Sequence, residues 1–522
     1  MVDFQNKATA GRSQPARRSL VAWLEIALGV YALAQLTLLA GLVISHWRFP
    51  LFLETMEGTV LQHAVRAADG LSIYPAPTLD FVSLAYTPLF YLISAPVLWI
   101  FGPELTALRI VATAGYTLAI WLVFAVGRDQ TRSPWWGLMA AGLFAASYAT
   151  MDAYLDTAHC DSWMLASVLL GTWIIDRAPS RNHVLLGVAV LCAAFWFKQH
   201  GALFAIGGVA YLTWKHGVRA SVPVWAIAAL LGPGLYAIAP LLFGPETHRF
   251  TLEVPSGWST FSPRAGLRIT AFLLISYPVL VWAVGYEYLA IYRQRFAALS
   301  IWHVQGIAAL ASGLMASLDT GGARNTFIPL GVFVILLGII GLARFSDGAA
   351  RSGWVKHAAL ALTALAFAML LYNPRPYLPR VNALAQYQAL TNALRELDGP
   401  VASLSLGQLP SGYHLEPGIL WVALDDMVRG PRARPANAVK AAALTSAFIA
   451  RPAPHYLLMT EPLAGTPLFD QMAPYYALER DFEKRFSALA GLPGTYPVRR
   501  SYPRYLYRRI TEQPQIVGQT VR

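Results

Sequence analysis

Long apolar stretches alternate with short polar connections along the first 370 residues of this chain. A helix needs roughly 17–25 mostly apolar residues to cross about 30 Å of hydrocarbon. The first such stretch covers 20–45, and others follow at about 105–126 and 134–150. Similar stretches recur until Tyr372, including an eighth between an external loop at 243–264 and a basic turn at Arg293. The pattern therefore predicts a polytopic α-helical membrane protein with about 11 transmembrane helices.

Two shorter amphipathic stretches, 58–68 and 89–101, lie between the first two long ones. They are too short to cross a bilayer, and amphipathic helices of this kind suit the membrane interface. We therefore predict an outer loop at 46–102 with two interfacial helices.

The pattern changes after residue 372. Short β-like runs at 401–406, 419–424 and 455–459 alternate with helix-like stretches at 381–397 and 437–450. About 150 residues suffice for one small domain. We therefore expect a membrane domain at 20–372 and a C-terminal α/β domain at 373–522.

Composition supports a membrane protein, because 56% of the 522 residues are hydrophobic and only 13% are charged. The net charge of +12 is distributed by position: the N-terminal tail, 1–19, is basic, and so is every predicted inner loop. Such loops face the cytoplasm. The basic character therefore does not indicate nucleic-acid binding. An odd number of spans would place the C-terminal domain outside the inner membrane of a bacterium, in the periplasm of a Gram-negative cell.

The first candidate chemistry is a pair of acids, Glu54 and Glu57, in the predicted outer loop. If that segment is helical, residues three apart lie on one face and can serve one site. A carboxylate in a partly dehydrated cleft can accept a proton from a hydroxyl at neutral pH. The alternative is that both acids favour the N-terminus of the helix near Gly58.

Other polar residues are predicted to lie on the same side of the membrane. Asp161 could bind a metal, orient a cation or hold a sugar hydroxyl, or it could cap a helix. Lys198, beside Gln199 and His200, could neutralise a phosphate or extend to the interface without a ligand. Arg324 could bridge phosphate oxygens or anchor a lipid headgroup. The remaining candidates for the substrate pocket are Tyr86, Asp156, His159 and Asn325.

In their order along the chain, these motifs resemble the GT-C membrane glycosyltransferases that use lipid-phosphate sugars. The resemblance is to the branch that contains protein mannosyltransferases and aminoarabinose lipid A transferases, and it covers roughly residues 20–345. It is carried by Glu54-Thr-Met-Glu57-Gly58, Asp69-Gly70, Ile73-Tyr74-Pro75, Tyr86-Thr-Pro88, Phe101-Gly102, Leu108-Arg109, Asp161, Lys198-Gln199 and Gly321-Gly322-Ala-Arg324-Asn325.

The resemblance implies that a sugar moves with inversion from a polyprenyl phosphate to an envelope glycan or lipid. It implies Glu57 as the base, with Glu54 as the alternative and Asp161 as a further catalytic residue. Lys198, Arg324 and Gln199 would then bind the donor phosphate. The sequence requires no cofactor, although a divalent metal is possible. Two other functions stay open, a transporter or lipid flippase and a non-catalytic envelope assembly protein.

Overall fold

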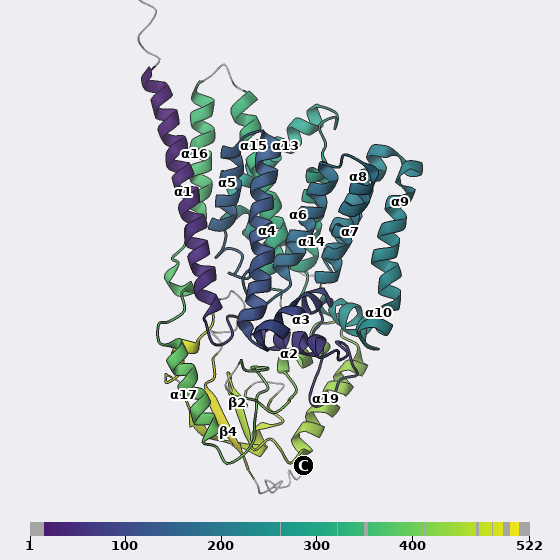
Figure 1. The fold of residues 1–522 in the computed structure, drawn as a ribbon, viewed down its shortest axis with the longest axis vertical. Helices are drawn as coiled ribbons and strands as arrows, with labels where there is room; N and C mark the ends of the chain where they lie inside the picture. The colour runs from purple at the N-terminus through teal and green to yellow at the C-terminus, as the bar shows by residue number, and fades with distance from the viewer. Residues whose placement is uncertain are drawn as a thin grey trace, which may run out of the picture.

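In the computed structural model, the described residues are 15–260, 263–320, 322–348, 353–410, 413–465, 469–482, 484–493 and 502–510. Figure 1 shows a bundle of long, roughly parallel helices with a smaller part of mixed helices and strands at one end. The basic residues at 1–14 of the N-terminal tail lie outside the described residues.

Helices form most of the bundle. Their bounds are α1 (Pro15–Trp47), α4 (Leu105–Thr131), α5 (Pro134–Ala146), α6 (Asp161–Asp176), α7 (Arg181–Phe197), α8 (Gly201–His216), α9 (Val218–Ala229), α10 (Leu235–Phe243), α12 (Pro263–Ser276), α13 (Pro278–Arg293), α14 (Ile301–Ser317), α15 (Ile328–Gly348) and α16 (Gly353–Met369). The α15 helix forms the centre of the bundle, where it is almost entirely buried against α13, α14 and their neighbours.

Among the described residues, four stretches are long and apolar enough to cross a membrane: Leu20–Trp47, Leu105–Thr131, Val218–Phe243 and Arg324–Asp347. The bent pair α12 and α13 can supply a fifth. The structure is thus that of a helical membrane protein, whereas the number of 11 crossings stays a prediction.

Two interruptions occur within the expected spans. The predicted eighth helix is broken into α12 and α13, which meet at 98°. Pro278 explains the break, because a residue before proline, here Tyr277, is pushed out of the helical conformation. A π-helix, η1 (Leu230–Gly234), joins α9 to α10 around Pro233.

Both segments predicted as interfacial helices are helical, as α2 (Glu57–Ala68) and α3 (Leu89–Phe101), and their place at the membrane interface stays a prediction. They pack against each other and lie across the end of the bundle, between it and the C-terminal part (Figure 1). Short helices complete this region: η2 (Arg249–Glu253), α11 (Val254–Trp258), η3 (Arg324–Phe327) and η4 (Arg375–Tyr377).

The C-terminal part contains a four-stranded sheet in the order β1-β2-β4-β3. β1 (Val401–Ala402) runs parallel to β2 (Tyr456–Met459), while β4 (Tyr505–Arg509) is antiparallel to both β2 and β3 (Tyr476–Asp481). Its helices are α17 (Ala383–Arg395), α18 (Trp421–Val428), α19 (Pro435–Ala450), η5 (Ala473–Tyr475) and η6 (Ser487–Leu489).

One predicted strand in this part is wrong. Residues 421–424 of the run expected as a strand at 419–424 begin α18 instead. A short apolar run is compatible with either structure. In the helix, Ala423, Leu424 and Met427 are buried together, and this packing decides the outcome.

Close backbone contacts join the C-terminal part to the first loop. A Cβ on Gly58 would lie 2.1 Å from the Leu406 carbonyl oxygen, so only glycine permits this approach. Gly407, with φ of +70°, packs against the same glycine. The C-terminal part is therefore seated directly on the start of α2.

Candidate functional site

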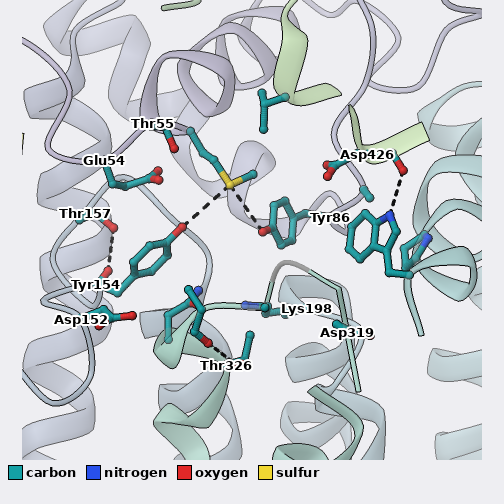
Figure 2. Close-up of a pocket in the computed structure, with 18 of the residues that line it drawn as sticks. Glu54, Thr55, Tyr86, Asp152, Tyr154, Thr157, Lys198, Asp319, Thr326 and Asp426 are labelled. Carbon is teal, nitrogen blue, oxygen red and sulfur yellow. Dashed lines mark hydrogen bonds between the residues drawn. The ribbon is translucent and has the colours of Figure 1, made fainter. Parts of the chain in front are cut away.

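A cavity of about 460 Å³ lies where the bundle, the first loop and the C-terminal part meet. Its walls come from segments that are far apart in the sequence: 53–56, 85–86, 152–157, 198–200, 255–258, 319–326, 421–429 and 492–493. Figure 2 draws 18 of the residues that line it and labels ten of these, including Glu54, Tyr86 and Lys198. The fold thus gathers several of the predicted outer-side residues around one space.

Glu54 lines this cavity, and one of its carboxylate oxygens has no hydrogen-bond partner among the described residues. Burial, and then the charge of Glu57, raise the pKa of Glu54 to about 8. Hydrogen bonds from the Met56 backbone and the Tyr154 side chain act in the opposite direction. A carboxylate with such a pKa can take up a proton near neutral pH.

Glu57 does not line the cavity and is fully buried. It forms an ion pair with the equally buried Arg109, with Nη2 2.6 Å from Oε2. Its carboxylate also accepts backbone hydrogen bonds from Leu53 and Ala158, both at 2.7 Å. The segment before Glu57 is not helical, because α2 begins at Glu57 itself. The two glutamates therefore do not share a helical face.

Lys198 faces the cavity from the end of α7 and is held by Asp161, with Nζ 2.8 Å from Oδ1. Burial lowers the pKa of Lys198, but the charge of Asp161 more than offsets this effect, so the pKa stays above its ordinary value. The ammonium lies 5.6 Å from the centre of the Tyr86 ring. An ammonium has three donors, so Lys198 can contact a ligand while keeping Asp161.

Asp161 itself is not a cavity residue. It begins α6, and its second oxygen lies 2.5 Å from Nδ1 of His159. His159 is buried between the Tyr86 and Tyr154 rings, at 4.7 and 4.9 Å between centroids. Burial lowers its pKa, which favours a neutral imidazole. Both residues lie directly behind the cavity wall that carries Lys198.

Gln199 lines the cavity, but its side-chain nitrogen is engaged on both sides. It donates to the carbonyls of Ala85 at 2.6 Å and Thr251 at 2.9 Å. The turn that carries Gln199 is tight because Gly201 packs against the end of α7, where a Cβ would meet the Ala194 carbonyl carbon at 2.2 Å. Gln199 therefore ties two cavity walls together.

Aromatic and sulfur-containing side chains form another part of the wall. The hydroxyls of Tyr86 and Tyr154 both point toward the Met56 sulfur, at 3.8 and 4.0 Å (Figure 2). Trp258 also lines the cavity and donates from Nε1 to the Asp426 carbonyl at 2.8 Å. Flat apolar surfaces of this kind suit the faces of a sugar ring.

The C-terminal part supplies cavity residues that the sequence analysis did not identify. Asp425, Asp426 and Arg429 extend from α18 or its end, and Arg429 pairs with Asp426 at 2.6 Å while lying over the Trp258 ring at 4.4 Å. Burial raises the pKa of Asp426 to about 7. The spacing Asp425-Asp426-x-x-Arg429 is typical of a helix. The sequence analysis did not use this signal, because it assigned the preceding run, 419–424, to a strand.

The other predicted residues are divided between the cavity and its surroundings. Asn325 is buried and lines the cavity, whereas Arg324 is exposed and does not line it. Asp156 lies elsewhere: its carboxylate is 2.6 Å from His46 Nδ1 and accepts a hydrogen bond from Tyr148 at 3.0 Å. The other nitrogen of His46 faces the Tyr377 carbonyl at 2.7 Å. Asp156 thus joins the acidic loop to the segment after α16.

One group among the described residues has the ligand types for a metal: His159, Cys160 and Asp161. The surrounding contacts do not fit a metal ion well. Nδ1 of His159 and both Asp161 oxygens already take part in the pairs described above, and the ammonium of Lys198 would repel a cation. Burial also raises the pKa of the Cys160 thiol, which disfavours the thiolate that binds metals.

Comparison with known proteins agrees with this architecture. Residues 85–243 match the family described as dolichyl-phosphate-mannose-protein mannosyltransferase. No curated protein sequence matches the chain.

Two solved structures of ArnT from Cupriavidus metallidurans have a similar fold. The apo form shares 13% identity over 92% of this chain and 97% of that chain, with a TM-score of 0.54. The form bound to undecaprenyl phosphate shares 14% identity over 93% and 99%, with a TM-score of 0.52. In its fold the chain is thus similar to ArnT, and residues 85–243 are similar in sequence to the mannosyltransferase family.

Proposed function

We propose that the protein is an inverting glycosyltransferase that moves a sugar from a polyprenyl phosphate to an envelope glycan or lipid. One observation carries this proposal: Glu54, a carboxylate with one unpartnered oxygen, and Lys198, a buried ammonium, line one cavity in a GT-C-like fold. The solved relative that binds undecaprenyl phosphate supports a lipid phosphate as part of the donor.

In this reaction Glu54 is the base. The acceptor hydroxyl gives its proton to the Glu54 carboxylate while its oxygen forms a bond to the anomeric carbon. The bond from that carbon to the phosphate oxygen breaks on the opposite face, and its electron pair leaves with the polyprenyl phosphate. Glu54 is preferred to Glu57 because both oxygens of Glu57 are already bound by Arg109 and by backbone amides.

Lys198 stabilises the departing phosphate. A positioned cation acts where charge develops in the transition state, and in a site that excludes water this effect is large. Asp161 keeps the ammonium charged and oriented, and therefore acts through Lys198. Asn325 offers a further polar contact in the cavity. Arg324 could approach a bound phosphate only if its exposed side chain turned toward the cavity.

An apolar groove beside the cavity suits the polyprenyl tail. Its volume is about 210 Å³, and its lining residues are Pro88, Leu89, Leu92, Ala189, Cys192, Ala193, Trp196, Leu231, Leu235 and Phe243. Pro88 in the groove is only two residues from Tyr86 in the cavity. A lipid in the groove would therefore present its phosphate near Lys198.

The distribution of basic residues predicts the orientation of the protein in the membrane. With the basic tail 1–19 in the cytoplasm of a bacterium, the cavity and the C-terminal domain at 373–522 face the outer side of the inner membrane. The acceptor is then an envelope molecule on that side. The domain would cover the cavity, since α18 supplies part of its wall.

The test is transfer of labelled sugar from a panel of polyprenyl-phosphate sugars by the purified protein with envelope lipid extract. We expect transfer by the wild type and its loss in Glu54→Gln with donor binding retained. Asp152→Asn is the matched control, because Asp152 lines the same cavity on another wall. Equal activity of wild type and Glu54→Gln would refute the role of Glu54.

The same preparation separates the two rival functions. A lipid flippase would move labelled donor between the leaflets of a vesicle without breaking the sugar–phosphate bond. A non-catalytic assembly protein would bind no donor and would be unaffected by Glu54→Gln in cells. A labelled product that requires Glu54 excludes both.

A further inference from the structure

One methionine, Met56, lines the cavity and is partly exposed there. It lies two residues after Glu54. Oxidants reach an exposed thioether more readily than one inside a packed core. Six other methionines are buried in this way, namely Met139, Met151, Met164, Met427, Met459 and Met472. Met56 is therefore open to small solutes that enter the cavity.

Two tyrosine hydroxyls face the Met56 sulfur. Tyr86, in the first loop, approaches it at 3.8 Å, and Tyr154, in the loop between α5 and α6, at 4.0 Å (Figure 2). A thioether is a weak acceptor. Both separations also exceed the length of an ordinary O–H···O bond, about 2.7–2.8 Å. An oxygen atom added to the sulfur on this side would shorten both separations and would be a stronger, polar acceptor. The two hydroxyls therefore suit the sulfoxide of Met56 better than its thioether.

The Tyr154 hydroxyl also supports the carboxylate of Glu54. Burial, and then the charge of Glu57, raise the pKa of Glu54 to about 8, while a hydrogen bond from Tyr154 acts in the opposite direction. A tyrosine hydroxyl has one proton to donate. A sulfoxide oxygen on Met56 would compete with Glu54 for that proton. Because the charged form of Glu54 would then lose a donor, its pKa would rise further.

We propose that Met56 is a site of oxidation to methionine sulfoxide, and that the sulfoxide deprives Glu54 of the hydrogen bond from Tyr154. The oxidant is a peroxide such as hydrogen peroxide. A lone pair of the Met56 sulfur forms the new bond to one peroxide oxygen, the O–O bond breaks, and the other oxygen leaves as water. The sulfur loses two electrons, which the peroxide gains. The effect on sugar transfer rests on the proposed function, whereas the oxidation itself does not.

Peptide mass spectrometry measures the oxidation without requiring transfer. The detergent-solubilised protein is treated with dilute hydrogen peroxide and digested, and the sulfoxide is quantified at each methionine over time. We expect Met56 to oxidise at least about tenfold faster than Met164 and Met459, which are 2% and 0% exposed. Met315, 49% exposed on α14, is the exposed reference. Oxidation of Met56 as slow as that of the buried pair would overturn the proposal.

Carbodiimide labelling reports the protonation of Glu54, because the reagent reacts with a carboxylic acid and not with a carboxylate. Labelling of Glu54 should fall as the pH rises through its pKa of about 8. After peroxide treatment this fall should move to higher pH by about one unit, because the charged form has lost a hydrogen bond. Tyr154→Phe should show the higher value before peroxide treatment and no further movement after it. An unchanged profile in oxidised wild type, or a profile of Tyr154→Phe that still moves, would refute the link to Glu54.

Two matched variants separate Met56 from the other methionines. Each protein is compared with its own untreated sample: Met56→Leu should abolish the movement, and Met315→Leu should retain it. In a transfer assay at pH 7, peroxide should lower the wild-type rate about tenfold, since the deprotonated fraction of Glu54 falls tenfold for each unit of pKa. The same fractional loss in Met56→Leu would overturn the proposal. Oxidation and labelling as expected, without any sugar transfer, would leave the Met56 site standing and refute the proposed function.

Discussion

The buried guanidinium of Arg109 donates to both oxygens of Glu57, from Nε at 3.1 Å and from Nη2 at 2.6 Å. It also donates to the carbonyls of His46, Phe49 and Leu51, which belong to the segment leading to Glu54. One ion pair thus fixes the path of the chain from α1 into the cavity wall. Glu57 and Arg109 are positioning residues in this arrangement, and Glu54 is the group they present.

Breaking this ion pair should destabilise the protein. Removing one partner leaves the other charge buried without compensation, which costs about 3–5 kcal/mol. We expect Glu57→Gln and Arg109→Met each to lower the thermal unfolding temperature of the detergent-solubilised protein. The double variant should lose less than the sum of the two single losses. Strict additivity of the losses would show that the two side chains do not stabilise each other.

The activity of the wild type should depend on the ionisation of Glu54. A base must be deprotonated, and burial with the charge of Glu57 raises the pKa of Glu54 to about 8. We therefore expect kcat/KM for transfer to rise with pH up to about 8 and then to level off. In Glu57→Gln this limb should move to lower pH, because the neighbouring negative charge is gone. A pH profile of initial rates measures both effects, and an unmoved limb in Glu57→Gln would contradict the assignment of Glu54.

Lys198 should affect the chemical step. Loss of one group that stabilises developing charge typically lowers kcat about 10²–10³-fold. We expect that loss in Lys198→Met, and a smaller one in Lys198→Arg, which keeps the charge. Asp161→Asn should lower kcat less than Lys198→Met does, since Asp161 acts through Lys198 and the lysine is still present. Single-turnover rates with saturating donor check this order, and Asp161→Asn falling below Lys198→Met would reverse the assigned roles.

A bulky side chain introduced into the groove assigned to the polyprenyl tail should compete with the lipid. Ala193 lines it on α7, so Ala193→Phe should raise donor KM while leaving kcat nearly unchanged. Leu186→Phe is the matched control, because Leu186 is 53% exposed on the same helix and does not line the groove. Donor KM values from transfer assays distinguish the two. An equal effect of both variants would argue for a general disturbance of α7.

Seating of the C-terminal part should depend on Gly430. This residue has φ of +92°, and a Cβ would lie 2.3 Å from the Gly257 carbonyl oxygen. Gly465 provides the control, since its φ is +84° but a Cβ there meets nothing within 4 Å. Gly465→Ala should cost only backbone strain, about 1–2 kcal/mol. Gly430→Ala should cost more and should accelerate proteolysis between the two parts, as followed by gel electrophoresis. Equal proteolysis rates would show that the Gly257 contact does not hold the C-terminal part.

The sequence by itself determined the helical membrane protein, the helices now seen as α2 and α3, and the helices now seen as α17 and α19. These features follow from local properties: the length of an apolar run, its periodicity, and the change in composition after residue 372. The same local signals failed at 419–424, where a short apolar run fits a strand or a helix equally well. Only packing against the rest of the C-terminal part selected α18.

Tertiary structure alone decided which polar residues share the cavity. Glu54 and Glu57 are close together in the sequence and of the same residue type. The Glu57 carboxylate is paired with Arg109, which lies 52 residues after Glu57, whereas Glu54 lines the cavity. Likewise, Arg429 faces the same space as Lys198 from more than 200 residues away. Such pairings form only because the fold brings segments that are distant in the sequence close together in space. Charge, burial and hydrogen bonding between distant segments are therefore decided by the packed fold and not by spacing along the chain.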